Sequence, residues 1–186
     1  MTPEKALRYA VQLEQQKAQA REQRIQAELT PLVLVLTDPD ESRRQAAVRC
    51  VQATCVPAVI ALLIDRLVAL LGGSGTVQRQ AIASLAEFGT RALPALTRRF
   101  SRSRSAPVQQ GIVEALAAVA RGLDRDGRLG LMTELLILLR VAAEESICES
   151  IARLLADLRC SLETGGQVPQ ARRSTAHAEH LKTVDG

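Results

Sequence analysis

Aromatic residues are nearly absent from this chain of 186 residues, which has no Trp, one Tyr and two Phe. β-Sandwiches and barrels depend on aromatic and β-branched strands, so this composition disfavours both classes. The same scarcity leaves little surface on which nucleobases or sugars could stack. Hydrophobic residues still make up 47% of the chain, mainly Ala, Leu, Val and Ile, which suit packed helices. The composition therefore predicts an all-α protein with a substantial core.

Cysteine is also scarce, and the four residues of this type form no CxxC pair and have no His at metal-ligand spacing. Cys50 and Cys148 lie among apolar helical positions, so we expect small free thiols in the core. The first residues are charged and polar and lack the apolar segment of a secretory signal. The most hydrophobic stretch, residues 56–71, contains Asp65 and Arg66 and is too short to cross a membrane. We expect a cytoplasmic protein that does not contact membranes.

Side chains in the patterns typical of catalysis or metal binding are lacking as well. His177 and His180 have HxxH spacing, but two ligands do not make a metal site. Asp124 and Asp126 resemble the start of a calcium loop, but the later ligand positions hold other residue types, which favours a turn and a helix cap. We therefore expect no catalytic residue, no metal, no cofactor and no enzymatic activity.

Polar capping residues beside prolines, and breaks rich in glycine, divide the chain into helices. Helix starts of this kind occur at Thr30-Pro31, at Asp38-Pro39 and at Ser105-Ala106-Pro107. No segment shows the strict alternation of a half-buried strand. The sequence predicts helices over residues 3–28, 31–37, 40–53, 57–71, 76–88, 92–102, 107–121, 127–141 and 144–159.

An apolar pattern at helical spacing recurs along the middle of the chain. Leu85 and Leu116 hold the same position in two copies that are 31 residues apart, and both fall in the predicted buried stripe. Small residues at other equivalent positions would let neighbouring helices approach closely. The copies span residues 43–54, 77–89, 108–120 and 147–158.

Residues 77–96 carry the best copy of a longer pattern, V-R-x-x-A-A-x-A-L-G-x-I-G followed by A-x-P-x-L, with Gly89, Pro94 and Leu96 in place. This pattern resembles the short HEAT repeat, including the form found in phycobilisome-lyase-like proteins. The resemblance covers about residues 30–160. It implies an α-solenoid of about four HEAT-like antiparallel helix pairs, and it implies no reaction.

Three positions depart from the HEAT pattern. Gln78 and Gln109 stand where the repeat often has Arg, and Arg43 stands where it has Val. These departures weaken the match at the first unit and leave the predicted fold unchanged.

The two ends of the chain differ from the repeats. We expect a polar N-terminal helix within residues 1–29 that caps or extends the repeat domain, which spans residues 30–160. Residues 161–186 contain Gly, Pro, Ser and His with little apolar periodicity, which is typical of a disordered tail. The apolar residues that would dock the first helix on the repeats are Leu7, Ala10 and Val11.

Positive charge is concentrated in one block. The chain has 24 Lys and Arg against 20 Asp and Glu, yet residues 66–113 carry seven Arg against Glu87 alone. Arg98 and Arg102 share a helix face opposite an apolar stripe, and the block ends beside the start of the next helix, whose free amides would add to an anion site. The candidate binding residues of this basic block are Arg91, Arg98, Arg99, Arg102 and Arg104.

The function that these features favour is a non-enzymatic protein-binding scaffold, adaptor or assembly factor, because stacked helix pairs offer a long surface without a deep pocket. A protein partner is expected, and an acidic one suits the basic block. Weak, salt-dependent binding of nucleic acid or another anion is the alternative. A third candidate function, a bilin-lyase-like chromophore chaperone, rests on the HEAT-repeat resemblance alone. The sequence also leaves open that the basic block is a solvated face, and it does not fix the partner or the oligomeric state.

Overall fold

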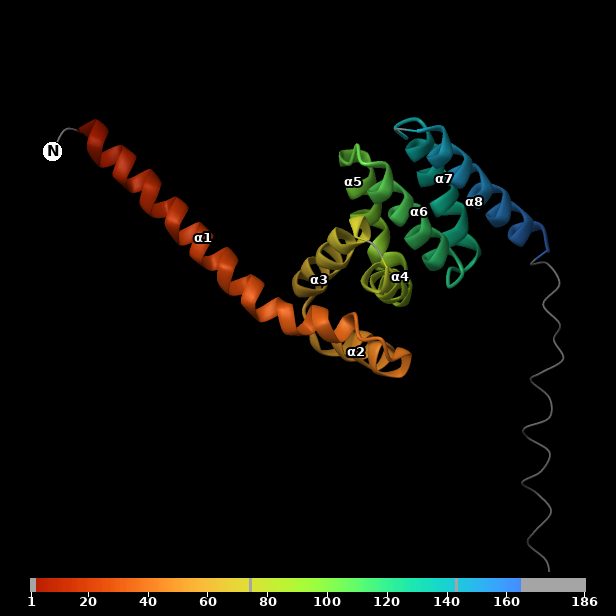
Figure 1. Ribbon diagram of the computed structural model, residues 1–186, viewed down its shortest axis with the longest axis horizontal. Helices are drawn as coiled ribbons and strands as arrows, with labels where there is room; N and C mark the ends of the chain where they lie inside the picture. The colour runs from red at the N-terminus through yellow and green to blue at the C-terminus, as the bar shows by residue number, and fades with distance from the viewer. Residues whose placement is uncertain (1–2, 74, 143, 165–186) are drawn as a thin grey trace, which may run out of the picture.

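The computed structural model describes residues 3–73, 75–142 and 144–164, and within these ranges it contains helices and no strand (Figure 1). The predicted all-α class is thus confirmed. None of the helices in these ranges has both the length and the apolar character needed to cross a bilayer. The elements are α1 (Pro3–Leu36), α2 (Glu41–Thr54), α3 (Pro57–Ala69), the 3-10 turn η1 (Leu70–Gly72), α4 (Thr76–Phe88), the 3-10 turn η2 (Gly89–Ala92), α5 (Leu93–Arg102), α6 (Ala106–Ala120), α7 (Arg125–Leu139) and α8 (Glu145–Thr164).

Consecutive helices alternate between two layers. Layer A consists of the end of α1 (residues 29–36), α3, α5 and α7, and layer B consists of α2, α4, α6 and α8. Each helix packs against its neighbours in its own layer and against a partner in the other layer (Figure 1). The result is a stack of four helix pairs, as predicted for an α-solenoid.

The buried stripes of the two layers meet in one continuous core. Leu85 on α4 and Leu116 on α6 are fully buried, which confirms the predicted register of the repeat. Leu96 and Phe100 on α5 are also fully buried and supply the facing surface from layer A. Each such side chain contributes about 1.5–3 kcal/mol by its removal from water, so contacts between neighbouring helix pairs hold the stack together.

Polar side chains at the start of three layer-B helices bind the linkers that precede them. Gln78 and Gln109, two of the departures from the HEAT pattern, and the equivalent Arg44 each donate to a backbone carbonyl six or seven residues earlier. A carbonyl held away from water needs such a donor. The bonds run from Arg44 Nη1 to Asp38 O (2.9 Å), from Gln78 Nε2 to Leu71 O (3.3 Å) and from Gln109 Nε2 to Ser103 O (3.0 Å).

Helix α6 passes very close to the linker before α4 at Gly111. A Cβ atom at this position would lie 2.4 Å from the carbonyl oxygen of Leu71 and 2.8 Å from Nε2 of Gln78. Glycine is therefore required here to let α6 pass the linker that leads into α4.

The predicted helix break at Thr30-Pro31 is wrong, because α1 runs through Pro31 without interruption. The proline costs the helix one backbone hydrogen bond. Leu29 and Leu36 lie seven residues apart on the same helix face, and both are buried, so a break would withdraw one of them from the core. The hydroxyl of Ser84 on α4 also donates to the carbonyl of Leu36, which fixes the end of α1 to the stack.

The N-terminal part of α1 extends away from the helix pairs (Figure 1). Every side chain that the structure describes between residues 12 and 28 is exposed. This arrangement favours an extension of the stack over a cap. The side chains of Leu7, Ala10 and Val11 lie outside the described part, so their predicted docking stays a prediction.

The helix starts only partly follow the predicted capping pattern. Asp40 rather than Asp38 caps α2, and its Oδ1 accepts from two backbone N–H groups at 2.8 and 3.2 Å. Asp124 caps α7 by accepting from the N–H of Gly127 at 2.8 Å, which confirms the predicted turn and cap. Ser105 precedes α6 as expected, but its hydroxyl makes no capping bond.

The four cysteines are free thiols, as expected, but Cys50 is exposed rather than buried. The equivalent position in α4, Ser84, faces back onto α1. Helix α2 is the first helix of layer B, so no earlier repeat covers Cys50. Cys148, the other predicted core thiol, is half-buried.

The last helix is longer than predicted. Helix α8 continues to Thr164, past the expected boundary at residue 160, and Leu162 on it is half-buried. The rest of the predicted tail, residues 165–186, lies outside the described residues.

We predict that Leu85→Ala and Leu116→Ala each lower the free energy of unfolding by about 2–4 kcal/mol, because each leaves a cavity at a fully buried position. Urea denaturation measures the change. Leu34→Ala is the control, since this side chain is 66% exposed and its loss should cost less than about 0.5 kcal/mol. Core variants that unfold at the urea concentration of the parent would show that the buried register is wrong.

A second pair of variants tests the close approach of α6. Gly111→Ala should lower the free energy of unfolding by about 1–3 kcal/mol, because the new methyl group overlaps a backbone carbonyl. Gly130→Ala in α7 should instead raise it by about 0.5–1 kcal/mol, since a Cβ atom there meets nothing within 4 Å. Thermal unfolding of both variants measures whether the unfolding temperature falls for Gly111→Ala and rises for Gly130→Ala. Equal shifts of the unfolding temperature would contradict the close packing at Gly111.

Candidate interaction surface

Helix α5 holds the basic block in a defined orientation. Leu96 and Phe100 point into the core, and Arg98 and Arg102 on the opposite side are exposed, as the helical spacing predicted. Arg99 beside them is exposed as well. The buried residues thus fix which way the guanidinium groups face.

Two hollows follow each other along the line where α3 and α5 lie side by side in layer A, and together we call them the α3–α5 groove. The hollow at the start of the helices has a volume of about 310 Å³, and the one at their ends has a volume of about 230 Å³. The α3 residues repeat at intervals of three and four, so they form one helix face, and the same holds for the α5 residues. The groove is lined by Pro57, Ile60, Ala61, Ile64, Asp65, Val68 and Ala69 on the α3 side and by Arg91, Ala95, Arg98, Arg99 and Arg102 on the other side.

The two walls of the groove differ in chemistry. The α3 wall is apolar except for Asp65, whereas the other wall presents four guanidinium groups. Arg98 Nη2 donates to Asp65 Oδ1 at 2.9 Å, and both side chains are 50% exposed. Arg91, Arg99 and Arg102 form no ion pair with any described residue. The groove therefore keeps an excess of positive charge along one wall.

The structure brings together most, but not all, of the predicted binding residues. Arg98, Arg99 and Arg102 share the hollow at the ends of the helices, and Arg91 stands at the opposite end of the groove. Arg104 is exposed in the linker after α5 and lines neither hollow. The sequence did not reveal Asp65 as a neighbour, because it precedes Arg98 by 33 residues and sits on another helix.

Exposed large apolar side chains are more numerous on or beside α1, α3 and α7 than on the other described helices. Within the described part of the chain, all but one of the large apolar residues with substantial exposure lie on α1, α3 or α7 or directly beside them; the exception is Val77 on α4. Concentrated apolar exposure marks surfaces that contact other proteins. The residues are Ile25, Leu34, Val35, Val56, Leu62, Leu129, Leu136, Ile137 and Val141.

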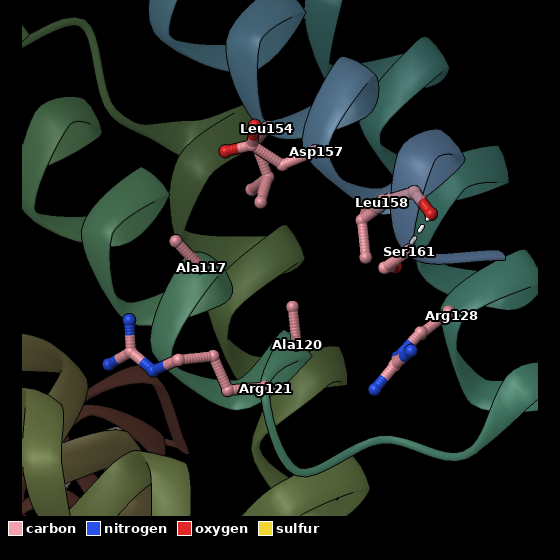
Figure 2. Close-up of a pocket in the computed structure, with 8 residues that line it drawn as sticks. All are labelled: Ala117, Ala120, Arg121, Arg128, Leu154, Asp157, Leu158 and Ser161. Atoms are coloured by element: carbon pink, nitrogen blue, oxygen red, sulfur yellow. Dashed lines mark hydrogen bonds between the residues drawn. The ribbon is translucent and has the colours of Figure 1, made fainter. Parts of the chain in front are cut away.

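A further hollow, which we call the C-terminal cleft, lies among α6, α7 and α8 and has a volume of about 380 Å³ (Figure 2). The sequence did not indicate this cleft, because its charged residues resemble ordinary charged residues of linkers and exposed helix faces. The cleft is lined by Ala117, Ala120, Arg121, Arg128, Leu154, Asp157, Leu158 and Ser161.

In the described ranges no three His, Cys, Asp or Glu side chains gather as a metal-ligand set. His177 and His180 lie outside these ranges.

Comparison with known proteins supports the repeat interpretation. Residues 29–117, which run from the end of α1 into α6, match the family model described as HEAT repeats. The match is to HEAT repeats in general and does not single out the phycobilisome-lyase-like form. No curated protein and no solved structure matches the chain.

We predict that the pair formed by Asp65 and Arg98 contributes little to stability. A double-mutant cycle with Asp65→Asn and Arg98→Gln should give a coupling energy of about 0.2–1 kcal/mol at low salt, because both side chains are half exposed to water. The coupling should shrink further in about 1 M salt, where screening is strong. A coupling above about 2 kcal/mol would instead make this pair a structural link between α3 and α5.

Proposed function

We propose that this chain is a non-enzymatic scaffold or adaptor that binds a protein partner on layer A, with an acidic segment of the partner in the α3–α5 groove. The observation that carries the proposal is the pairing of an apolar wall on α3 with a row of guanidinium groups on the other wall. HEAT repeats commonly act as protein-interaction scaffolds, and the match over residues 29–117 supports this class.

The chemistry of the groove selects a segment with one acidic and one apolar side. Carboxylates would pair with Arg99 and Arg102, whose planar forks bind them with two parallel hydrogen bonds. Apolar side chains of the segment would contact Ile60 and Ile64 on the facing wall. Exposed arginines of this kind mainly accelerate association with an acidic partner.

The length of the groove also suits a peptide segment. Arg91 in η2 and Arg102 at the end of α5 are 11 residues apart, which corresponds to roughly 16 Å at the rise of an α-helix. About three turns of a partner helix, or five residues of an extended chain, would occupy it. The apolar residues of α1 and α7 flank the groove in the same layer and would enlarge the contact.

Nucleic acid remains the second candidate, and the arginine row is the observation that favours it. A phosphate backbone would use the guanidinium groups but would leave the apolar α3 wall in water, so the groove suits a protein better. No observation favours a bilin-lyase-like chaperone. We also propose a cytoplasmic location, which the four free thiols support.

The test replaces Arg98, Arg99 and Arg102 with Ala and compares partner capture from lysate of the native cells, with and without nuclease. We expect folding to be retained, because the three side chains are exposed. Partners should survive nuclease with the parent protein, and the variant should associate with them more slowly. Association rates measured on a sensor surface quantify this loss.

A matched control removes three other exposed arginines, Arg49, Arg79 and Arg153, which lie on layer B and cause the same change in net charge. This control should bind as the parent does. Loss of every partner on nuclease treatment would favour nucleic acid, and the salt slope should then fall by about one for each lost phosphate contact. If the parent and the variant that lacks Arg98, Arg99 and Arg102 bind partners equally well, the basic block is only a solvated face.

A further inference from the structure

Helix α6, inside the stack, shows which edges of a layer-B helix contact its neighbours. It lies between α4 and α8 and buries both of its edges. One edge, represented by Ala115, faces the preceding helix pair, because the equivalent Ser84 of α4 donates to the carbonyl of Leu36 in that pair. The other edge, represented by Val113, faces the following pair, because Ala117 one turn later lines the hollow shared with α8. A helix at an end of the stack should bury only one of these edges.

The uncovered edge of α2 is the one that faces backward. Cys50, at the position of Ala115, is exposed, whereas Ala115 itself is fully buried. Val48, at the position of Val113, is buried because α2 packs against α4 on that side. We call the uncovered edge of α2 the front edge, and its exposed residues are Arg43, Ala46, Cys50 and Ala53.

Helix α8 leaves the opposite edge uncovered. Ala152, at the position of Val113, is exposed, whereas Leu154, at the position of Ala115, is buried against α6. We call the uncovered edge of α8 the rear edge, and its exposed residues are Glu145, Glu149, Ala152 and Ala156. The front and rear edges are thus the two halves of the contact that joins neighbouring helix pairs inside the stack. Both carry short side chains, which let another helix approach closely.

The contact between α6 and α8 gives the register in which a front edge would meet a rear edge. Ser150 Oγ on α8 donates to Gln110 Oε1 on α6 at 3.3 Å. In the repeat alignment Gln110 is equivalent to Glu149, and Ser150 is equivalent to Ala46. The same register between two copies of the chain would place Glu149 of one copy beside Ala46 of the other.

Opposite charges lie on the two edges near this point. Arg43 precedes Ala46 by one turn, so the register places it between Glu145 and Glu149 of the facing edge. Within the described residues Arg43 has a single long ion pair, 3.9 Å to Asp40, and the two glutamates have none. Arg43 stands where the later copies of the repeat have Val or Ile, so its charge departs from the pattern at the position where it would meet the rear edge.

Layer A exposes apolar side chains at the same two ends of the stack. Leu34 and Val35 on α1 and Leu129 and Leu136 on α7 are all exposed. Solenoids that end in water normally carry a polar outer face on their terminal repeats, so apolar ends favour a further helix pair. The N-terminal part of α1 runs away from the helix pairs and leaves α2 open (Figure 1).

We propose that the front edge of one copy of this chain binds the rear edge of another, so that copies join head to tail into a longer solenoid. The occupant is a second copy because one chain carries both halves of the contact, with opposite charges on them. Two different surfaces meet in each contact, so the copies form open chains or rings rather than a symmetric pair. The contact uses no residue of the α3–α5 groove, so it stands or falls independently of the proposed scaffold function.

Sedimentation velocity of the full chain between about 5 and 300 µM tests the self-association. We expect the weight-average mass of the parent to rise with concentration. Ala46→Glu on the front edge and Ala152→Glu on the rear edge should each weaken self-association at least about tenfold and should fold, because both alanines are exposed. Ala58→Glu is the matched control, since Ala58 is exposed on α3 and lies at neither end of the stack, and it should associate as the parent does.

A mixture of the two edge variants identifies the head-to-tail arrangement. The rear edge of the Ala46→Glu chain and the front edge of the Ala152→Glu chain are intact, so these two chains should join. Growth should stop at a complex of two chains, because the other edge of each is blocked.

Charge reversal tests the pairing across the contact. Arg43→Glu and Glu149→Arg should each weaken self-association about threefold or more. The chain that carries both changes should regain most of the loss, because the reversed pair meets between copies. A double variant no stronger than the single variants would contradict the pairing.

Four outcomes would overturn the proposal. They are a parent that stays monomeric up to about 300 µM, a control as weak as the edge variants, a mixture that forms no complex, and an Ala46→Glu chain that associates as the parent does. The last outcome would indicate a symmetric contact between rear edges.

Discussion

The stack depends on its continuous apolar core, and hydrogen bonds from three of the layer-B helices fix the linkers that precede them. Each of these three linkers turns the chain from layer A to layer B and contains a backbone carbonyl where water has limited access. Gln78 and Gln109 supply the missing donors, and Arg44 does the same for the first pair. A carbonyl left without its donor would cost about 1–3 kcal/mol. These bonds hold three of the linkers in place, whereas the buried Leu96 and Phe100 fix which residues of α5 face water.

Local sequence rules account for most of the fold. The repeated apolar stripe placed Leu85 and Leu116 in the core, and prolines and glycines marked most helix ends within a few residues. The failures occurred where tertiary contacts outweigh local preference. Pro31 is held inside α1 because Leu29 and Leu36 are buried on either side of it. Cys50 was predicted to be buried because the equivalent positions in later repeats are buried. An earlier repeat covers those positions, whereas no repeat precedes α2.

The candidate sites were less accessible to sequence reasoning than the fold. Helical spacing was enough to predict that Arg98 and Arg102 face outward, because one helix decides their direction. The facing wall of the groove comes from α3, and the pairing of Asp65 with Arg98 depends on how two helices from different repeats are placed. The C-terminal cleft is lined by three helices, so it depends on how α6, α7 and α8 are placed relative to one another.

The continuity of α1 through Pro31 turns the N-terminal part of this helix into a rigid arm. Residues 3–28 span about 39 Å along the helix axis, and the same helix ends under Ser84 in the stack. A flexible linker would let the two ends sample many separations, whereas an unbroken helix sets a single distance and direction. A molecule bound to the N-terminal end of α1 is therefore held at a fixed distance from layer A. Its effective concentration near layer A is higher than a flexible linker of the same length would give.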